Sequence, residues 1–166
     1  MNDTQQQHTI SVYVANKPGV LMRVSQVFAR RGYNIESLVV SPALDGKFSR
    51  MTLGAAGDPE TLSQIIKQLG KLVDVVHATE HVSANVLQKE LALIKVGITQ
   101  DARTEVLQLV THFKAQTVDL TEDSLVIQVT GNSDKLDAMI VLLKKHGIIE
   151  IVRTGKVVMA RGQEAT

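Results

Sequence analysis

The stretch that decides the fold is Asn16-Lys17-Pro18-Gly19-Val20-Leu21, which joins a strand pattern to a helix pattern. Before it, apolar and polar side chains alternate from Thr9 to Ala15, the period of a strand with one buried face. After it, apolar residues recur at helical spacing from Val20 to Arg31, and Gly32 can take the left-handed conformation that ends helices. The pattern predicts a strand, a turn and an amphipathic helix.

The turn is built to expose backbone N–H groups. Pro18 fits the first turn of a helix, Asn16 is a capping residue, and Gly19 leaves its backbone uncovered by any side chain. Free donors and the positive end of the helix dipole together suit a carboxylate. Two interpretations stay open from the hexapeptide alone: ordinary helix capping, or a site for a small anion.

Composition bounds the class of protein. The chain has 166 residues, is 44% hydrophobic and carries a formal net charge of +1. It can therefore build a core, and no global field attracts nucleic acid or an anionic membrane. The absence of cysteine excludes disulfides, thiolate catalysis and cysteine-based metal sites. Residues 1–8 form a polar tail without signal-peptide character, and no apolar run reaches the length of a membrane span, so we expect a cytoplasmic protein.

The rest of the chain repeats one order of elements. The first copy has helices from Val20 and, capped by Asp58, from Pro59, with strands at Thr9–Ala15, Ile35–Ser41, Phe48–Ala55 and Val73–Val82. The second has helices capped by Asp101 and Ser133, with strands at Leu91–Ile98, Thr117–Leu120, Leu125–Thr130, Ile148–Val152 and Lys156–Ala160. A βαββαβ unit packs as an antiparallel sheet with both helices on one face. We predict an α+β protein of two tandem ferredoxin-like domains, residues 9–82 and 91–161, with a linker at 83–90 and a frayed tail at 162–166.

The sequence predicts no catalytic residue and no metal site. His77-Ala78-Thr79-Glu80-His81 matches the H-x-x-E-H string of some zinc proteases. Its two histidines share a metal only on a helix, whereas the surrounding valines favour a strand, on which four residues span roughly 13 Å. A serine elbow and a Walker-type phosphate loop are both absent from the sequence.

Nucleic acid is also an unfavoured partner. The RNA-recognition domain has the same βαββαβ order and stacks bases on aromatic residues of its central strands. The equivalent strand here, Phe48 to Leu53, has one aromatic residue, and aromatic residues make up 3% of the chain. Arg30-Arg31 and Lys144-Lys145 are interpreted as solvated helix ends.

A small amphiphile at the first turn remains as a ligand. Asn34 follows Gly32-Tyr33 at the entry to the second strand and has both a donor and an acceptor. We expect it to reach, across the end of the sheet, the same space as Gly19. The alternative is a turn asparagine that satisfies the local backbone.

Four strings carry a resemblance to a known family: Asn16–Leu21, Arg31–Leu38, Ser49–Thr52 and Gln68–Val75. With them, residues 9–162 resemble the small regulatory subunits of acetolactate synthase, also called acetohydroxyacid synthase. The first half resembles an ACT domain, a module that binds amino acids and controls enzymes. The second half is similar to the family's C-terminal domain, through Ala92–Val96 and the Arg153-Thr154-Gly155 turn, and has no ligand motif.

The resemblance implies a noncatalytic partner of a large thiamine-diphosphate enzyme of valine, leucine and isoleucine biosynthesis. It implies that thiamine diphosphate, Mg²⁺ and FAD belong to that large subunit and that this chain binds no cofactor. It further implies stimulation of the large subunit, feedback inhibition by valine, and a homodimer whose ACT domains pair edge to edge with effector sites at the interface. An ACT-type sensor for a different enzyme or regulator stays open as the alternative.

The resemblance also assigns residues to the valine site. The effector loop corresponds to Asn16, Gly19, Val20 and Leu21, and the opposing contribution from the partner chain corresponds to Asn34 and Ile35. The helix start would take the carboxylate, the two asparagines would orient the ligand, and Leu21 and Ile35 would form apolar walls. We also hypothesise that a sheet-exposed segment contacts the large subunit, namely Ser49, Arg50, Met51 and Thr52.

Overall fold

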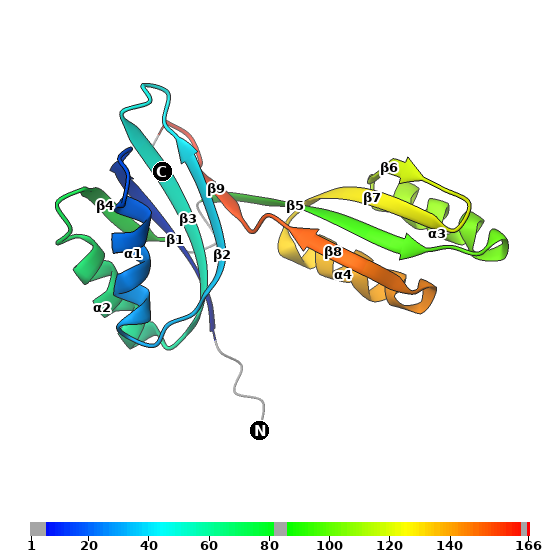
Figure 1. Ribbon diagram of the computed structural model, residues 1–166, viewed down its shortest axis with the longest axis horizontal. Coiled ribbons are helices and arrows are strands. Elements are labelled where there is room, and N and C mark those ends of the chain that lie inside the picture. Colours follow the sequence, from blue (N-terminus) through cyan, green and yellow to red (C-terminus); the bar gives the residue numbers. More distant parts are fainter. Residues whose placement is uncertain (1–5, 82–85, 164–165) are drawn as a thin grey trace. The chain divides into compact units, whose positions relative to one another are not determined.

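The computed structural model describes residues 6–81, 86–163 and 166. The chain divides into two compact units, unit 1 with Met1–Leu87 and Gly155–Thr166, and unit 2 with Gln88–Thr154. Each has an antiparallel sheet and a pair of helices (Figure 1), which confirms the predicted α+β class with two ferredoxin-like repeats. Within these ranges, no helix combines the length and the apolar character needed to cross a bilayer.

Unit 1 is a four-stranded sheet, in the order β2-β3-β1-β4, with both helices on one face (Figure 1). Its elements are β1 (Gln6–Ala15), α1 (Val20–Ala29), β2 (Ile35–Pro42), β3 (Phe48–Gly57), α2 (Pro59–Leu69) and β4 (Val75–Glu80). The core forms where alternate strand residues meet one stripe of each helix, including Ile10, Val12, Phe28, Leu62 and Ile65, each with no exposed surface. We call the opposite face of this sheet, away from α1 and α2, the open face.

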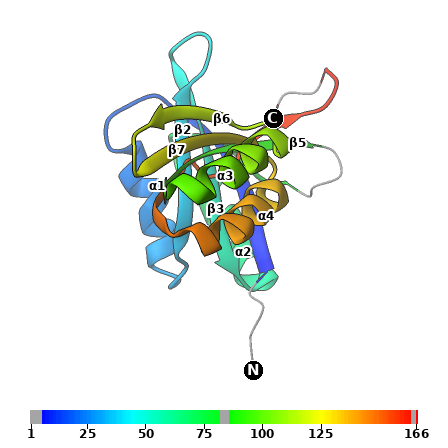
Figure 2. The ribbon, with the colours of Figure 1, turned by 90° about the vertical axis from the view of Figure 1, so that its right-hand side faces the viewer.

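Unit 2 repeats the arrangement with strand order β6-β7-β5-β8. Its elements are β5 (Val86–Gly97), α3 (Gln100–His112), β6 (Gln116–Leu120), β7 (Ser124–Gly131), α4 (Ser133–Leu143), the 3₁₀ turn η2 (Lys144–His146) and β8 (Ile148–Arg153). Figure 2 shows α3 and α4 side by side on one face of the sheet. The core of unit 2 lies between these helices and the sheet. It includes Ile94, Val106, Ile127, Leu136 and Met139, each with no exposed surface.

The structure corrects the boundaries predicted between the domains. β5 already begins at Val86, inside the predicted linker, whose residues 83–85 lie outside the described part of the chain. The chain returns to unit 1 at Gly155, so β9 (Val157–Ala160) groups with unit 1 by its packing, while its hydrogen-bonded neighbour is β5. The last residue is not frayed, since Thr166 is 8% exposed and its hydroxyl oxygen accepts from the Ala160 N–H at 2.7 Å. Strand periodicity shows where β9 is but not which sheet it joins.

Two of the predicted helix caps are also corrected. Asp58 caps α2 as predicted, but Thr99 replaces Asp101 at the start of α3, and Asn132 replaces Ser133 at the start of α4. Thr99 and Asn132 have extended backbone and each accepts from the N–H three residues on, at 3.3 and 3.2 Å. The cap must precede the first helical residue, and each helix starts earlier than the apolar pattern indicates.

Because Asn132 and not Ser133 caps α4, alanine substitutions at these two adjacent residues should change the stability by different amounts. We expect Asn132→Ala to lower the free energy of unfolding by about 1 kcal/mol, because the Lys135 N–H loses its acceptor. Ser133→Ala should change it by no more than about 0.5 kcal/mol, because this residue is already helical and alanine favours helix. Urea unfolding followed by circular dichroism measures both. Equal losses for the two variants would contradict the assignment of the cap.

Candidate functional site

The loop between β1 and α1 presents a bare helix start. Gly19 is the N-cap with φ +82° and ψ −8°, and no side chain caps the helix. Among the described residues, none accepts a hydrogen bond from the backbone N–H groups of Gly19, Leu21 or Met22. A side chain at Gly19 would be strained by the positive φ, and it would approach Arg23 at 3.7 Å. Three free donors therefore converge at the positive end of α1.

Asn16 holds this loop in place and does not cap the helix. Its backbone N–H donates to the Lys47 carbonyl at 2.9 Å, and its side-chain Nδ2 donates to the Gly46 carbonyl at 3.0 Å. Both acceptors lie between β2 and β3, and Pro18 lies outside the helix, in the turn before it. The predicted capping role of Asn16 is therefore wrong, because both its backbone N–H and its side-chain amide hold the loop to the turn between β2 and β3.

The side chains around the helix start separate into buried and exposed ones. Val20, which was predicted to belong to the effector loop, is 2% exposed. Its side chain packs in the core and does not line the surface. Leu21 and Met22 are 42% and 61% exposed and offer apolar surface beside the free donors. Met22 and Arg23 were not predicted; Arg23 forms an ion pair with Asp74 at 2.5 Å. Both residues could have been predicted from the sequence, since the residues of a helix's first turn surround its start.

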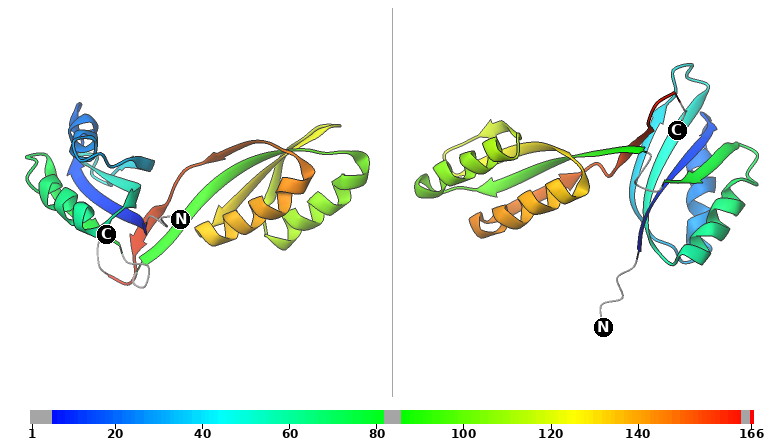
Figure 3. Two further views of the ribbon diagram at one scale, coloured as in Figure 1. Left: turned by 90° about the horizontal axis from the view of Figure 1, so that it is seen from below. Right: turned by 180° about the vertical axis from the view of Figure 1, so that it is seen from behind.

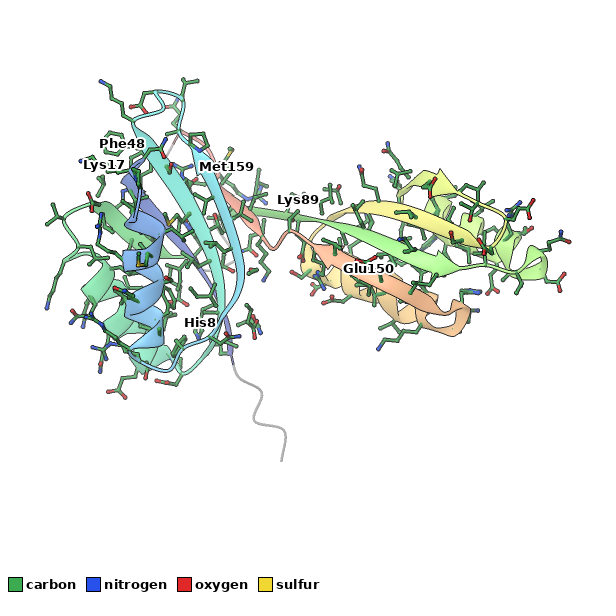
Figure 4. All side chains as sticks on the ribbon, in the orientation of Figure 1. His8, Lys17, Phe48, Lys89, Glu150 and Met159 are labelled. Atoms are coloured by element: carbon green, nitrogen blue, oxygen red, sulfur yellow. The ribbon has the colours of Figure 1, made fainter. Side chains whose placement is uncertain are left out.

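Asn34 and Ile35 lie at the other end of unit 1, which contradicts the expectation that Asn34 reaches Gly19 within one chain. Ile35 pairs with Ala55, which pairs with His8, whereas the loop follows Ala15 at the far end of β1. The separation along β1 is 15 − 8 = 7 residues, or roughly 23 Å. Figure 4 shows the two ends, marked by Lys17 and His8. The residues predicted for the valine site therefore lie in two separate places within one chain.

Asn34 is exposed but its position is well defined. The preceding Tyr33 is 9% exposed, and its hydroxyl donates to the Asp58 carbonyl at 2.5 Å. Burial, followed by the Asp58 charge, raises the pKa of Tyr33, so the hydroxyl keeps its proton and remains a donor. This bond fastens the turn that carries Asn34 to the start of α2.

The segment proposed to contact the large subunit is mostly buried. Met51 is 3% exposed and packs in the core beneath the helices, while Ser49 and Thr52 are each 5% exposed. Only Arg50 in this group is partly exposed. The prediction of a continuous exposed segment is therefore wrong, because alternation on β3 sends Met51 to the helix side and Arg50 to the open face.

Known proteins now identify the family. A family model described as an AHAS small subunit-like ACT domain matches residues 10–77, and one described as the small subunit of acetolactate synthase matches residues 89–162. The chain belongs to the acetolactate synthase small-subunit family. Its first repeat is an ACT domain, and as a family member the chain is the regulatory small subunit of a transferase complex.

Individual members of the family are similar in sequence to this chain over nearly its whole length. A probable acetolactate synthase small subunit of Archaeoglobus fulgidus is 46% identical over 95% of this chain and 98% of its own length. The acetolactate synthase small subunit of Mycolicibacterium smegmatis is 43% identical over 93% of this chain and 91% of its own. The crystal structure of the Thermotoga maritima small subunit is 39% identical, with a TM-score of 0.84, and covers 96% of this chain and 99% of that one.

In this small subunit, aromatic residues stand in a row across the open face. Tyr13 lies between Phe48 and His77, with ring centroids 5.2 and 5.5 Å apart and interplanar angles of 22° and 26°. Arg50 Cζ lies 5.7 Å from the centre of the Tyr13 ring. Since neighbouring strands are about 4.8 Å apart, these rings stack on one another across the strands. Both faces of Tyr13 are occupied, so this row is not a base-stacking platform.

The histidines of the H-x-x-E-H string are engaged separately. His77 stacks on Tyr13 from β4, and His81 Nε2 lies 2.7 Å from Ser11 Oγ. Glu80, between them, contacts His8 Nδ1 at 2.6 Å. Within residues 6–81, 86–163 and 166, no three acidic or histidine side chains are grouped as a metal would require.

His81 makes the stability of unit 1 sensitive to pH. Burial, with a further contribution from Arg50, lowers the pKa of His81 below its ordinary value of 6.5. As pH falls through this value, the unfolded chain gains the proton first, so the free energy of unfolding decreases. In urea unfolding of the parent, the free energy of unfolding should decrease between about pH 7.5 and about pH 5.5, and we expect this decrease to be smaller in His81→Gln. His112→Gln in unit 2 controls for the substitution, and a decrease as large in His81→Gln as in the parent would refute the assignment.

Proposed function

We propose that this small subunit stimulates the thiamine-diphosphate-dependent large subunit of acetolactate synthase and confers feedback inhibition by valine. The observation that carries the proposal is the set of free N–H donors at the start of α1 in an ACT domain of this family. In this proposal thiamine diphosphate, Mg²⁺ and FAD are held by the large subunit, and the chain itself senses the end product in the cytoplasm.

The groups at the helix start are complementary to those of a branched-chain amino acid. Its free N–H groups and the helix dipole suit the carboxylate, and Oδ1 of Asn16 suits the ammonium group. The exposed parts of Leu21 and Met22 offer apolar contact to an isopropyl group. Arg23 is already paired with Asp74, so the backbone is the principal partner of the carboxylate.

A complete site requires two copies of the chain. Gly19 and Asn34 lie at opposite ends of one sheet, and antiparallel pairing of two equal edge strands places the Gly19 end of one copy level with the Asn34 end of the other. Of the two edge strands, β2 carries the residues Leu38, Val39 and Val40, no lysine, and a single charge at Glu36. Such an edge is suited to pairing with a second copy. We therefore propose a homodimer through β2 with valine bridging the protomers.

A ligand that bridges two chains can regulate a third. Valine binding would favour the dimer arrangement in which the large subunit is less active, and the difference in affinity between arrangements sets the extent of inhibition. The decisive experiment is reconstitution with the large subunit, with and without valine. We expect acetolactate formation to rise when the small subunit is added and to fall when valine follows. Valine binding without any stimulation would instead indicate a sensor for a different enzyme.

The proposed role of the helix start at Gly19 in binding the carboxylate can be tested by introducing a negative charge there. We expect Gly19→Asp to weaken valine binding at least about tenfold in calorimetry, because the new carboxylate lies beside the ligand carboxylate and replaces it at the donors. Gly162→Asp is the matched control: Gly162 has φ +76° against +82° at Gly19, and a side chain there meets open space. Equal affinity in Gly19→Asp and Gly162→Asp would exclude the helix start as the carboxylate site.

Mixed dimers test whether the site is shared. We expect Gly19→Asp and Asn34→Ala homodimers each to bind valine poorly. When the two variants are mixed and allowed to exchange, each mixed dimer has one intact site, made of unaltered Asn34 from one protomer and unaltered Gly19 from its partner. Calorimetry should then recover part of the heat. If mixing restores nothing although mass spectrometry shows exchange, the site is not shared between protomers.

A further inference from the structure

Ser37 on β2 is enclosed by two glycines. A Cβ built on Gly54 of β3 would lie 2.4 Å from Ser37 Oγ, and one built on Gly155 would lie 2.5 Å from Ser37 Cβ and 2.7 Å from its Oγ. Real Cβ contacts are not that short. The contact at Gly54 involves only the Ser37 hydroxyl, which can rotate, whereas the contact at Gly155 involves the fixed Cβ, so residue 155 must be glycine while residue 37 has a side chain. Gly155 also has φ +82°, which glycine adopts without strain. We call the contact among Ser37, Gly54 and Gly155 the clasp.

The clasp fastens the C-terminal segment of unit 1 to its sheet. Figure 3 shows β9, which carries Met159 in Figure 4, on the open face. On that face Thr9, Ser11 and Thr52 are 6%, 1% and 5% exposed although no helix covers them. Val158 of β9 is itself 6% exposed. The returning chain is therefore packed against unit 1 and is not a loose end.

The chain is also anchored immediately before the clasp, in unit 2. Thr154, the last residue of unit 2, donates its N–H to the Leu91 carbonyl at 3.0 Å, and its hydroxyl accepts from the Leu91 N–H at 3.1 Å. Arg153 makes a double contact with the buried Glu90, at 2.6 and 3.2 Å, and one with Asp137 at 2.6 Å. The single bond between Thr154 and Gly155 thus joins two firmly held segments.

The other side of the clasp leads to the half-site at Asn34. Ser37 is three residues after Asn34, and the ladder between β2 and β3 is irregular between Ile35 and Ser37. A bulge leaves its extra residue unpaired and bends the strand at that point, so Ser37 is joined to Asn34 and Ile35 by the chain itself. Movement of Asn34 and Ile35 would therefore reach Ser37, whose contact with Gly155 leaves no room for it to be absorbed.

We propose that the clasp is the coupling element by which occupation of the Asn34 half-site is passed to Gly155, the residue at which the chain returns to unit 1, and hence to regulation of the large subunit. The inference rests on the proposed function, since it presumes valine regulation. Its physical basis is a close-packed contact between a segment that meets the ligand and the residue at which the chain leaves unit 2. It assigns a regulatory role to Ser37 and Gly155, neither of which belongs to the proposed half-sites.

Exchanging the side chain between the two positions provides the test. Gly155→Ala drives a methyl group into Ser37, and Ser37→Gly empties the contact. In the double variant Ser37→Gly/Gly155→Ala, the new Cβ lies 3.7 Å from the Cα of residue 37, an ordinary van der Waals contact. Gly162→Ala in the same segment reproduces the positive φ, +76° against +82°, without a neighbour within 4 Å. Each protein is assayed for valine binding alone and for valine inhibition with the large subunit.

We expect both single variants to bind valine within about threefold of the parent while the valine concentration for half-inhibition rises at least about fivefold. The double variant should return towards the parent value, and Gly162→Ala should not differ from it. Stimulation without valine reports that each protein is folded and docked.

Parent-like inhibition in both single variants would overturn the inference, as would joint loss of binding and inhibition without recovery in the double variant. Absence of valine binding in the parent would instead overturn the proposed function, and the inference with it.

Discussion

The register of β1 with β3 is the constraint on which the rest of unit 1 depends. The two strands pair without interruption from Gln6 opposite Gly57 to Ala15 opposite Phe48. A slip of one residue would turn Ile10, Val12 and Val14 out of the core, so the hydrophobic effect holds this register firmly. Because α1 begins just after one end of this ladder and β2 begins beside the other, the register also separates the two half-sites. In the proposed dimer, the need for a second copy follows from strand pairing and not from any property of the ligand.

Backbone conformation at the helix start leaves hydrogen-bond donors free on this scaffold. Gly19 ends the loop in a left-handed conformation, and the Asn16 side chain is fastened to the turn between β2 and β3. The donors of the first turn are therefore free in a loop that is held at both ends. Preorganised donors of this kind bind an anion without first giving up contacts of their own. Two other polar pairs of the unit, His8 with Glu80 and His81 with Ser11, connect β1 with β4 and the residue that follows it.

The chain crosses between the two units twice. The chain enters unit 2 after Leu87, within β5, and leaves it after Thr154, and its last residues pack in unit 1. Arg153, in the last strand of unit 2, is held by Glu90 and Asp137. The hydrogen bond with Glu90, followed by the one with Asp137, raises the pKa of Arg153.

The sequence by itself determined the two βαββαβ repeats, the cap at Asp58 and the exposed backbone at Gly19, because periodicity, capping and glycine conformation are local properties. It located Asn34 in a turn but not its distance from Gly19, which depends on how β2 and β3 are paired. It placed Ser49 to Thr52 on a strand, yet burial of Met51 depends on which face the helices cover. Only the tertiary structure decided that β9 belongs to unit 1 and that Ser37 meets Gly155, since contacts between residues more than a hundred positions apart leave no periodic signal in the chain.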